Sequence, residues 1–395
     1  ILLTAGLLFF LVRWCKSFLT WKGRRRWFSL FQRLTRWEFW PPLAIYPWVI
    51  LYVIGLGFKY RSFTLPSLAN PGLPLGGWVE SKGQILGLLS GRSPDAVGNL
   101  HALPPETNLR RRADQALAAI PSWPAVIKPD QGERGVGVAI VENSQELWRY
   151  LRNHPEPLIV QQYHAGLEFG VFWSRNIETG KGQVTSIAAK IPLSLKGDGE
   201  RTLEELILAH PRAVCQAATF LQHFPQASRW IPASGQEVTL APIGSHSRGA
   251  VFLNRSDLIT PALTWALNDL MEALPGFSLG RFDLKVSSEK DLKSGKNLRI
   301  LELNGITSEP SHIYHPHYPY WKGIRDLCRQ WKLAFTWGDY YRQQGFPTPP
   351  LRLLTRVTLA HVFRKKPQST QSPPDSASND AFPDMQHIPI SPNNG

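Results

Sequence analysis

The sequence predicts an α+β fold that follows a hydrophobic and basic N-terminal segment. From Val126 onward, short β-rich runs alternate with helical patterns. Residues 1–62 combine apolar runs with many basic side chains, whereas residues 364–395 are rich in Ser, Pro, Asn and Asp. We therefore expect five parts: a membrane-associated segment at 1–62, a connector and reduced N-terminal region at 63–125, the main α+β domain at 126–340, a C-terminal extension at 341–363 and a disordered tail at 364–395.

The net charge of the chain indicates which classes of binding partner are plausible. The 395 residues carry a formal net charge of +14, which makes nucleic acid, anionic lipid and phosphorylated ligands plausible partners. Much of this charge is local, because Glu38 is the only acidic residue between Arg13 and Arg61. The three cysteines are far apart and odd in number, which favours a reducing compartment.

The stretch from Phe39 to Phe58 has no charged residue and is long enough to cross a hydrocarbon core. Prolines at 41, 42 and 47 interrupt its first turns, and basic residues flank both ends. We therefore expect a re-entrant or interfacial segment that contacts the cytoplasmic face of a membrane. The alternative is a buried hydrophobic hairpin of a soluble protein.

A glycine-rich loop between two short strands occupies residues 126–141. Gly132, Gly135 and Gly137 would let backbone N–H groups approach an anion, and Lys128 would add a fixed positive charge at the end of the first strand. This pattern is typical of a phosphate-binding flap. An ordinary hairpin with a mobile loop is the alternative, since the loop matches neither a Walker motif nor a dinucleotide fingerprint.

The next two strands, 158–163 and 166–170, are separated by a short bend across which a nucleotide could lie. Backbone groups of Gln161, Gln162 and Tyr163 could contact an adenine edge, and Glu168 would accept hydrogen bonds from ribose hydroxyls. On its own, a glutamate at the start of a strand is usually just solvated.

Two late strands, 280–286 and 298–304, carry polar residues at alternating positions. Because side chains alternate across a strand, we expect two faces. The polar face would hold Arg281, Asp283, Glu302 and Asn304, and the core face Phe282, Leu284, Leu301 and Leu303. The oxygens of Asp283, Glu302 and Asn304 suit Mg²⁺, and Arg281 would face a phosphoryl group. A solvent-exposed strand face with a chance ion pair is the alternative.

Taken in order, these segments resemble the ATP-grasp ligases. KPDQGERGVGV, IVQQYHAGLEF, GRFD and ELN match the flap, hinge, ribose and metal motifs of that family over roughly residues 126–316. The stretch 189–206 is similar to cyanophycin synthetases, where a basic residue matching Lys190 binds phosphate, and Thr202 to Glu205 reads independently as a capping box. The resemblance implies ATP and Mg²⁺ as cofactors, a carboxylate and an amine as small-molecule substrates, and an acyl-phosphate intermediate that releases ADP.

The loop 304–316 resembles the substrate side of D-alanine:D-alanine ligases, which implies roles for Ser311 and His312. Glu309 departs from that pattern and would place a carboxylate near the acceptor amine. Arg248 could hold the acyl phosphate, and an ordinary surface arginine is the alternative. No nucleic acid partner is expected. Two other classes remain open: a kinase of the same fold that does not ligate, and a basic protein that binds a membrane surface or nucleic acid.

Overall fold

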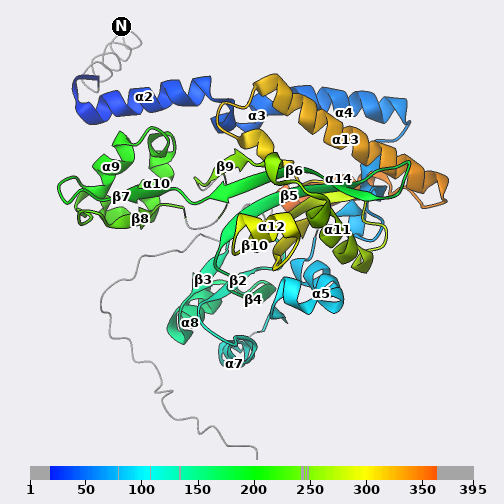
Figure 1. Cartoon of the computed structure of the whole chain (residues 1–395), viewed down its shortest axis with the longest axis horizontal. Coiled ribbons are helices and arrows are strands. Elements are labelled where there is room, and N and C mark those ends of the chain that lie inside the picture. The colour runs from blue at the N-terminus through cyan, green and yellow to red at the C-terminus, as the bar shows by residue number, and fades with distance from the viewer. Residues whose placement is uncertain are drawn as a thin grey trace, which may run out of the picture.

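The computed structural model describes residues 18–362 apart from 79, 107, 133–134, 242–243, 245 and 247–248. Within this part of the chain the fold is a mixture of helices and antiparallel strands (Figure 1). Two larger sheets lie below a layer of N-terminal helices, and a small two-stranded unit lies to one side. The expected disordered tail at 364–395 and the first seventeen residues lie outside the described residues.

The first sheet has the strand order β1-β4-β2-β3 and carries the predicted flap. Its strands are β1 (Leu100–Leu103), β2 (Ala125–Pro129), β3 (Ala139–Val141) and β4 (Leu158–Gln162). Helices α7 (Leu109–Ala119) and α8 (Ser144–Asn153) pack on one face through a buried apolar cluster. The Asn143 side chain caps α8 by accepting a hydrogen bond from the N–H of Glu146 at 3.0 Å. Of the region expected to be a connector, β1 thus joins the same sheet as the flap and α7 packs on that sheet.

The second sheet has the order β11-β10-β5-β6-β9 and holds the largest core. Its strands are β5 (Leu167–Arg175), β6 (Gly182–Ile191), β9 (Val251–Asn254), β10 (Leu279–Val286) and β11 (Arg299–Asn304). One face is apolar and packs against α5 (Lys82–Arg92), α6 (Pro94–Val97), α11 (Pro261–Leu270) and α12 (Glu289–Ser294).

A small unit beside the second sheet pairs β7 (Ser194–Lys196) with β8 (Glu237–Thr239) under α9 (Leu203–Ala209) and α10 (Ala217–His223). The predicted capping box is confirmed: Thr202 Oγ1 accepts from the Glu205 N–H, and a Glu205 carboxylate oxygen accepts from the Thr202 N–H at 2.9 Å. The capping box sets the residue at which α9 begins and so defines one end of this small unit.

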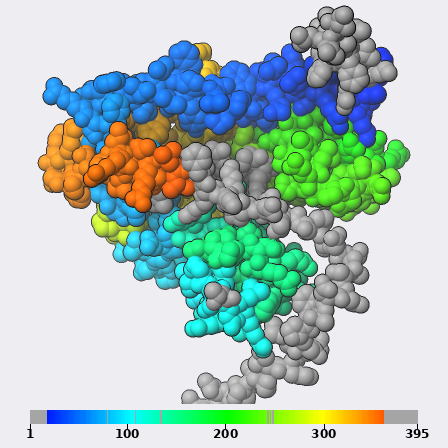
Figure 2. Space-filling view, turned by 180° about the vertical axis from the view of Figure 1, so that it is seen from behind, coloured from blue at the N-terminus to red at the C-terminus, as the bar shows by residue number. Residues whose placement is uncertain are grey.

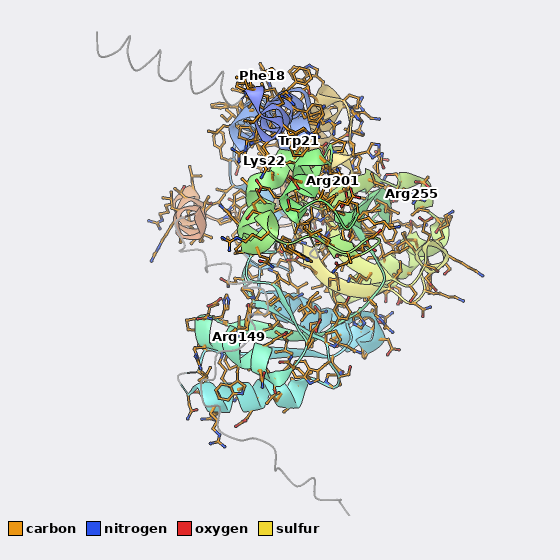
Figure 3. All side chains as sticks on the ribbon, turned by 90° about the vertical axis from the view of Figure 1, so that its left-hand side faces the viewer. Phe18, Trp21, Lys22, Arg149, Arg201 and Arg255 are labelled. Atoms are coloured by element: carbon orange, nitrogen blue, oxygen red, sulfur yellow. The ribbon has the colours of Figure 1, made fainter. Side chains whose placement is uncertain are left out.

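The N-terminal helices form a continuous layer along one edge of the molecule (Figure 2). They are α2 (Trp21–Thr35), the short turn η1 (Trp37–Phe39), α3 (Pro42–Ile45) and α4 (Pro47–Lys59). Val49 of α4 shares one buried cluster with Ile324 and Leu327 of α13 (Tyr320–Gln343), and Leu56 shares another with Phe335. Figure 3 places Phe18 and Trp21 at this edge, at the opposite end of the molecule from Arg149.

The apolar stretch at 39–58 is thus split at its prolines, because proline starts α3 and α4 and cannot continue a preceding helix. Across the described residues, every helix is either too short or too polar to span a bilayer. Residues 341–362 contain the end of α13 and α14 (Leu351–Val362).

Candidate active site

A cavity of about 880 Å³ lies between the first sheet, the second sheet and the N-terminal layer. Its wall includes most of the side chains predicted to bind nucleotide, phosphate and metal. These are Lys128, Gly132, Gly135, Gln161, Tyr163, Glu168, Lys190, Arg281, Asp283, Glu302 and Asn304. The structure therefore brings together residues that lie more than a hundred positions apart in the sequence.

Pairing between β10 and β11 explains the polar wall. Arg281 lies opposite Asn304 and Asp283 lies opposite Glu302, so these four side chains face the cavity. A β-bulge shifts the register after Asp283, where Leu284 pairs with Ile300. The prediction that Leu301 faces the core is wrong: Leu301 lines the cavity and Ile300 is buried in the core, because the bulge inserts one extra residue into β11.

Asp283 is the centre of a buried charge network. The Arg281 guanidinium donates to both Asp283 oxygens at 2.9 and 3.1 Å, and Lys190 Nζ lies 3.0 Å from Asp283 Oδ1 and 3.1 Å from Glu168 Oε1. Burial alone would raise the pKa of Asp283, but Arg281 and Lys190 outweigh it and lower the pKa. Lys190 responds in the opposite sense: burial lowers its pKa, and Asp283 and Glu168 reverse the shift to a raised pKa. Both groups are therefore charged at neutral pH.

Lys128 reaches across from the first sheet to the second. Its Nζ donates to Gln161 Oε1 and to the Leu301 carbonyl, both at 2.8 Å. Burial lowers the pKa of Lys128 to about 8, although Glu302 opposes the shift. Gln161 also donates to the Ile300 carbonyl at 3.0 Å, so its side chain holds Lys128 and the bulged strand together.

Lys82 at the start of α5 belongs to the same wall and was missed by the sequence reasoning. Its Nζ donates to the Gly132 carbonyl at 2.6 Å and pairs with Glu302 at 3.1 Å. It therefore links the flap to the second sheet. Nearby Glu80 accepts a hydrogen bond from the Gly305 N–H. Burial raises the pKa of Glu80 to about 8, and the neighbouring Glu302 adds to the shift.

The flap glycines differ in their placement. Gly132 and Gly135 line the cavity, whereas Gly137 lies behind it and accepts a hydrogen bond from Tyr150 through its carbonyl. Gly137 has a φ of +74°, and a Cβ there would come within 2.6 Å of Pro129. A side chain at 137 would therefore displace the end of β2, the strand that carries Lys128.

The predicted hinge consists of β4 and Tyr163 directly after it, and two of its three predicted residues face the cavity. Gln161 and Tyr163 line it, and the Lys285 ammonium lies 5.1 Å from the centre of the Tyr163 ring. Gln162 does not line the cavity, and its N–H is donated to the Asn99 carbonyl at 2.9 Å. An adenine edge would therefore meet the backbone next to Tyr163 rather than the Gln162 N–H.

The residue types around Asp283 suit a hard cation, and both Asp283 oxygens are at present paired with Arg281 and Lys190. Asp283 and Glu302 are cross-strand neighbours, and Asn304 Nδ2 lies 3.4 Å from Asp283 Oδ2. Two carboxylates and one amide oxygen are ligands that Mg²⁺ prefers together with phosphate oxygens. Among the described residues, no group of three or more His, Cys, Asp and Glu side chains could hold a metal ion. The candidate set thus needs Asn304 and phosphate to complete it.

The substrate-side loop is only partly in the cavity. Glu309 and Ser311 line it, and the Glu309 carboxylate accepts a hydrogen bond from Tyr314 at 2.5 Å. Burial raises the pKa of Glu309. Ser311 Oγ is buried without a hydrogen-bond partner among the described residues. His312 points instead toward Asp326, with Nε2 3.4 Å from Oδ2, and does not line the cavity. Arg248 lies outside the described residues.

The N-terminal layer supplies a wall that the motifs did not predict. Glu38 of η1 is buried, and each of its two carboxylate oxygens lies 3.1 Å from Arg212 Nη1. Its Oε2 also lies 3.5 Å from His246 Nε2, and the His246 ring stacks on Tyr314 at 4.9 Å. Glu38, His246 and Tyr314 all line the cavity. One buried carboxylate thus joins the N-terminal layer to the substrate side of the site.

Some known proteins are similar to parts of this chain in sequence or in structure. Two curated cyanophycin synthetases, from Trichormus variabilis and a Nostoc species, are each 22% identical over 221 residues. The match covers 51% of this chain but spans only 24% of those relatives. No protein-family model matches the chain.

Solved structures similar to the chain include a glutathione synthetase and a D-alanine–D-alanine ligase. A bifunctional glutathione synthetase from Pasteurella multocida is 18% identical with a TM-score of 0.33, covering 65% of this chain and 38% of its own. A D-alanine–D-alanine ligase from Bacillus anthracis is 14% identical with a TM-score of 0.39, covering 67% and 69%.

Proposed function

We propose that this chain, which resembles the ATP-grasp ligases in its motifs and its sequence relatives, is an ATP-dependent carboxylate–amine ligase that releases ADP and phosphate. One observation carries the proposal: Lys128, Lys190 and Arg281 converge with Asp283 and Glu302 in one cavity beneath the flap. Fixed cations around a carboxylate pair are what transfer of a phosphoryl group requires.

In the proposed reaction, an oxygen of the substrate carboxylate attacks the γ-phosphorus of ATP, the bond to the β-phosphate oxygen breaks, and ADP leaves. Charge develops on the phosphoryl oxygens, and Lys128, Lys190 and Arg281 would stabilise it. Asp283 holds both Lys190 and Arg281 by ion pairs, so the cations are positioned before substrate arrives. Mg²⁺ held by Asp283, Glu302 and Asn304 would neutralise the phosphates.

The second step makes the amide. A neutral amine attacks the acyl carbon of the acyl phosphate, the C–O bond breaks and inorganic phosphate leaves. Glu309 lies in the same wall, and the Arg281 Nη1 donates to its backbone carbonyl at 3.0 Å. Because burial raises its pKa, the Glu309 carboxylate is a stronger base than a solvated one and would accept the proton that the amine loses.

The test is nucleotide turnover by the full chain with fractionated metabolites. We expect ADP and not AMP, and hydroxylamine should trap the acyl phosphate as a hydroxamate, which a kinase acting on a hydroxyl group would not give. Asp283→Asn should abolish ADP release, whereas Asp269→Asn, at a surface pair with Arg92, should leave it unchanged. Activity without nucleotide, or full ADP release by Asp283→Asn, would contradict the proposal.

We also propose that the enzyme works on the cytoplasmic face of a membrane, with the N-terminal layer as the contact. Helix α2 has two faces. Arg25 and Ser29 bond to carbonyls of the body at 2.7–2.9 Å, and the opposite face exposes Leu30, Phe31 and Leu34. An outward apolar stripe flanked by exposed arginines is typical of an interfacial helix.

Helices α3 and α4 extend this surface. Leu43 is 88% exposed, and Trp48, Leu51 and Phe58 are also exposed. Replacing Leu34 and Leu43 by Asp should weaken sedimentation with vesicles containing phosphatidylserine by ~10-fold or more, because burial of each leucine contributes about 1.5–3 kcal/mol. Leu88→Asp, at an exposed leucine of α5, is the matched control. Equal sedimentation of the three proteins would refute the membrane contact.

A further inference from the structure

The cavity extends beyond the groups that nucleotide binding and acyl transfer use. The part of the cavity under the N-terminal layer, which we call the second arm, is lined by Arg33, Glu38, Gln216 and Thr219 and by a set of apolar and aromatic side chains. These are Phe39, Trp40, Pro42, Ile45 and Tyr46 from the layer, and Ala218 from α10. The total volume of about 880 Å³ is near the upper end of the roughly 300–1,000 Å³ that small-molecule pockets occupy.

One of the two charged groups that the N-terminal layer places in this arm is neutralised by its neighbours. Glu38 is engaged by Arg212 and His246, so its charge is neutralised within the wall. Arg33 also lines the cavity, is exposed, and forms no ion pair among the described residues. The arm therefore combines apolar and aromatic surface with one exposed cation, Arg33.

The same arm is adjacent to the exposed apolar surface of the N-terminal layer. Pro42 lines the cavity, and the next residue, Leu43, is 88% exposed. Figure 2 shows the layer as a strip along the edge of the molecule. An apolar chain could therefore pass from a bilayer into the arm while remaining against apolar side chains of α3.

We infer that one of the two substrates is an amphiphile: a lipid-like molecule whose carboxylate or amino head reaches Arg281 and Glu309 and whose apolar chain lies in the arm beneath α3. This inference rests on the proposed ligase activity and names a substrate class for it. A substrate of amino-acid size would leave the apolar wall exposed to water, which is unfavourable.

The test separates the substrate class from the ligase activity. Cells of the source organism are divided into a lipid extract and an aqueous extract, and ADP release by the full-length protein is measured with each and with both. We expect release to require the lipid extract. Full release with the aqueous extract alone would overturn the amphiphile and leave the ligase proposal standing. Absence of release under all conditions would remove the ligase proposal, and the inference with it.

A matched pair of variants tests the arm itself. Ala218 on α10 and Ala118 on α7 are both exposed helical alanines, and only Ala218 lines the cavity. Ala218→Trp should raise the amount of lipid extract needed for half-maximal ADP release by about tenfold or more without changing the KM for ATP. Ala118→Trp should match the wild type. An unchanged lipid requirement in Ala218→Trp would overturn the placement of the chain.

Discussion

The pair between Glu38 and Arg212 provides the sharpest prediction about how the N-terminal layer is attached. Their side chains are 3% and 9% exposed, and both carboxylate oxygens of Glu38 lie 3.1 Å from the guanidinium. Glu38→Gln keeps the size of the side chain but leaves Arg212 buried without a counter-charge. Removing one partner of a buried pair costs ~3–5 kcal/mol, and we expect the lower end because the glutamine oxygen can still accept a hydrogen bond.

The assay is urea unfolding followed by tryptophan fluorescence. With a slope of about 3 kcal/mol per molar urea, a loss of ~3 kcal/mol lowers the midpoint by ~1 M. Glu272→Gln removes a surface partner of Arg92 and should change the free energy of unfolding by less than about 1 kcal/mol. If the two variants unfold at the same urea concentration, the reasoning about Glu38 is refuted.

The pH dependence gives a second check on Glu38. Burial raises the pKa of Glu38, but His246 and Arg212 lower it by a larger amount, so the net shift is downward. A carboxyl group with a lowered folded-state pKa stabilises the fold above its unfolded pKa, and this contribution is lost as the pH falls through the folded value. The gap between the wild type and Glu38→Gln should therefore narrow as the pH falls below the unfolded value of 4.5.

Three further variants test the site. Arg281→Lys loses the bidentate hydrogen bonds to Asp283. It should lower kcat for ADP release ~100-fold with little change in the KM for ATP. Lys82→Met releases the Gly132 carbonyl, so without nucleotide the flap should be cut faster by protease, as mass spectrometry of the fragments would show. Glu80 has a pKa of about 8 in the folded protein against 4.5 in the unfolded chain. The free energy of unfolding should therefore fall by ~1.4 kcal/mol per pH unit as the pH rises between these two values. In urea titrations at several pH values, Glu80→Gln should remove this dependence.

The polar face of the late strands could be predicted because strand alternation is a local rule. Arg281 and Asp283 are two residues apart in one strand, and so are Glu302 and Asn304 in the other. Leu301 could not be placed in this way. The bulge that turns it into the cavity arises from the pairing of β10 with β11, which the sequence of one strand does not contain.

Lys82 and Glu38 were missed for a different reason. Neither lies in a glycine-rich loop or a recurring motif, and each comes from a segment that precedes the flap. Their roles depend on how those segments pack on the body: Lys82 meets Glu302 more than two hundred positions away, and Glu38 meets Arg212. Contacts of such long sequence separation leave no local pattern.

The packing of α4 against α13 bears on how this protein can be prepared. Val49 and Leu56 share buried clusters with Ile324 and Phe335. Removing residues 1–62 would therefore expose the apolar surface of α13 to solvent. It would also remove one wall of the cavity. Such a shortened protein should aggregate. Soluble protein is better obtained by replacing exposed leucines of the full chain with polar residues.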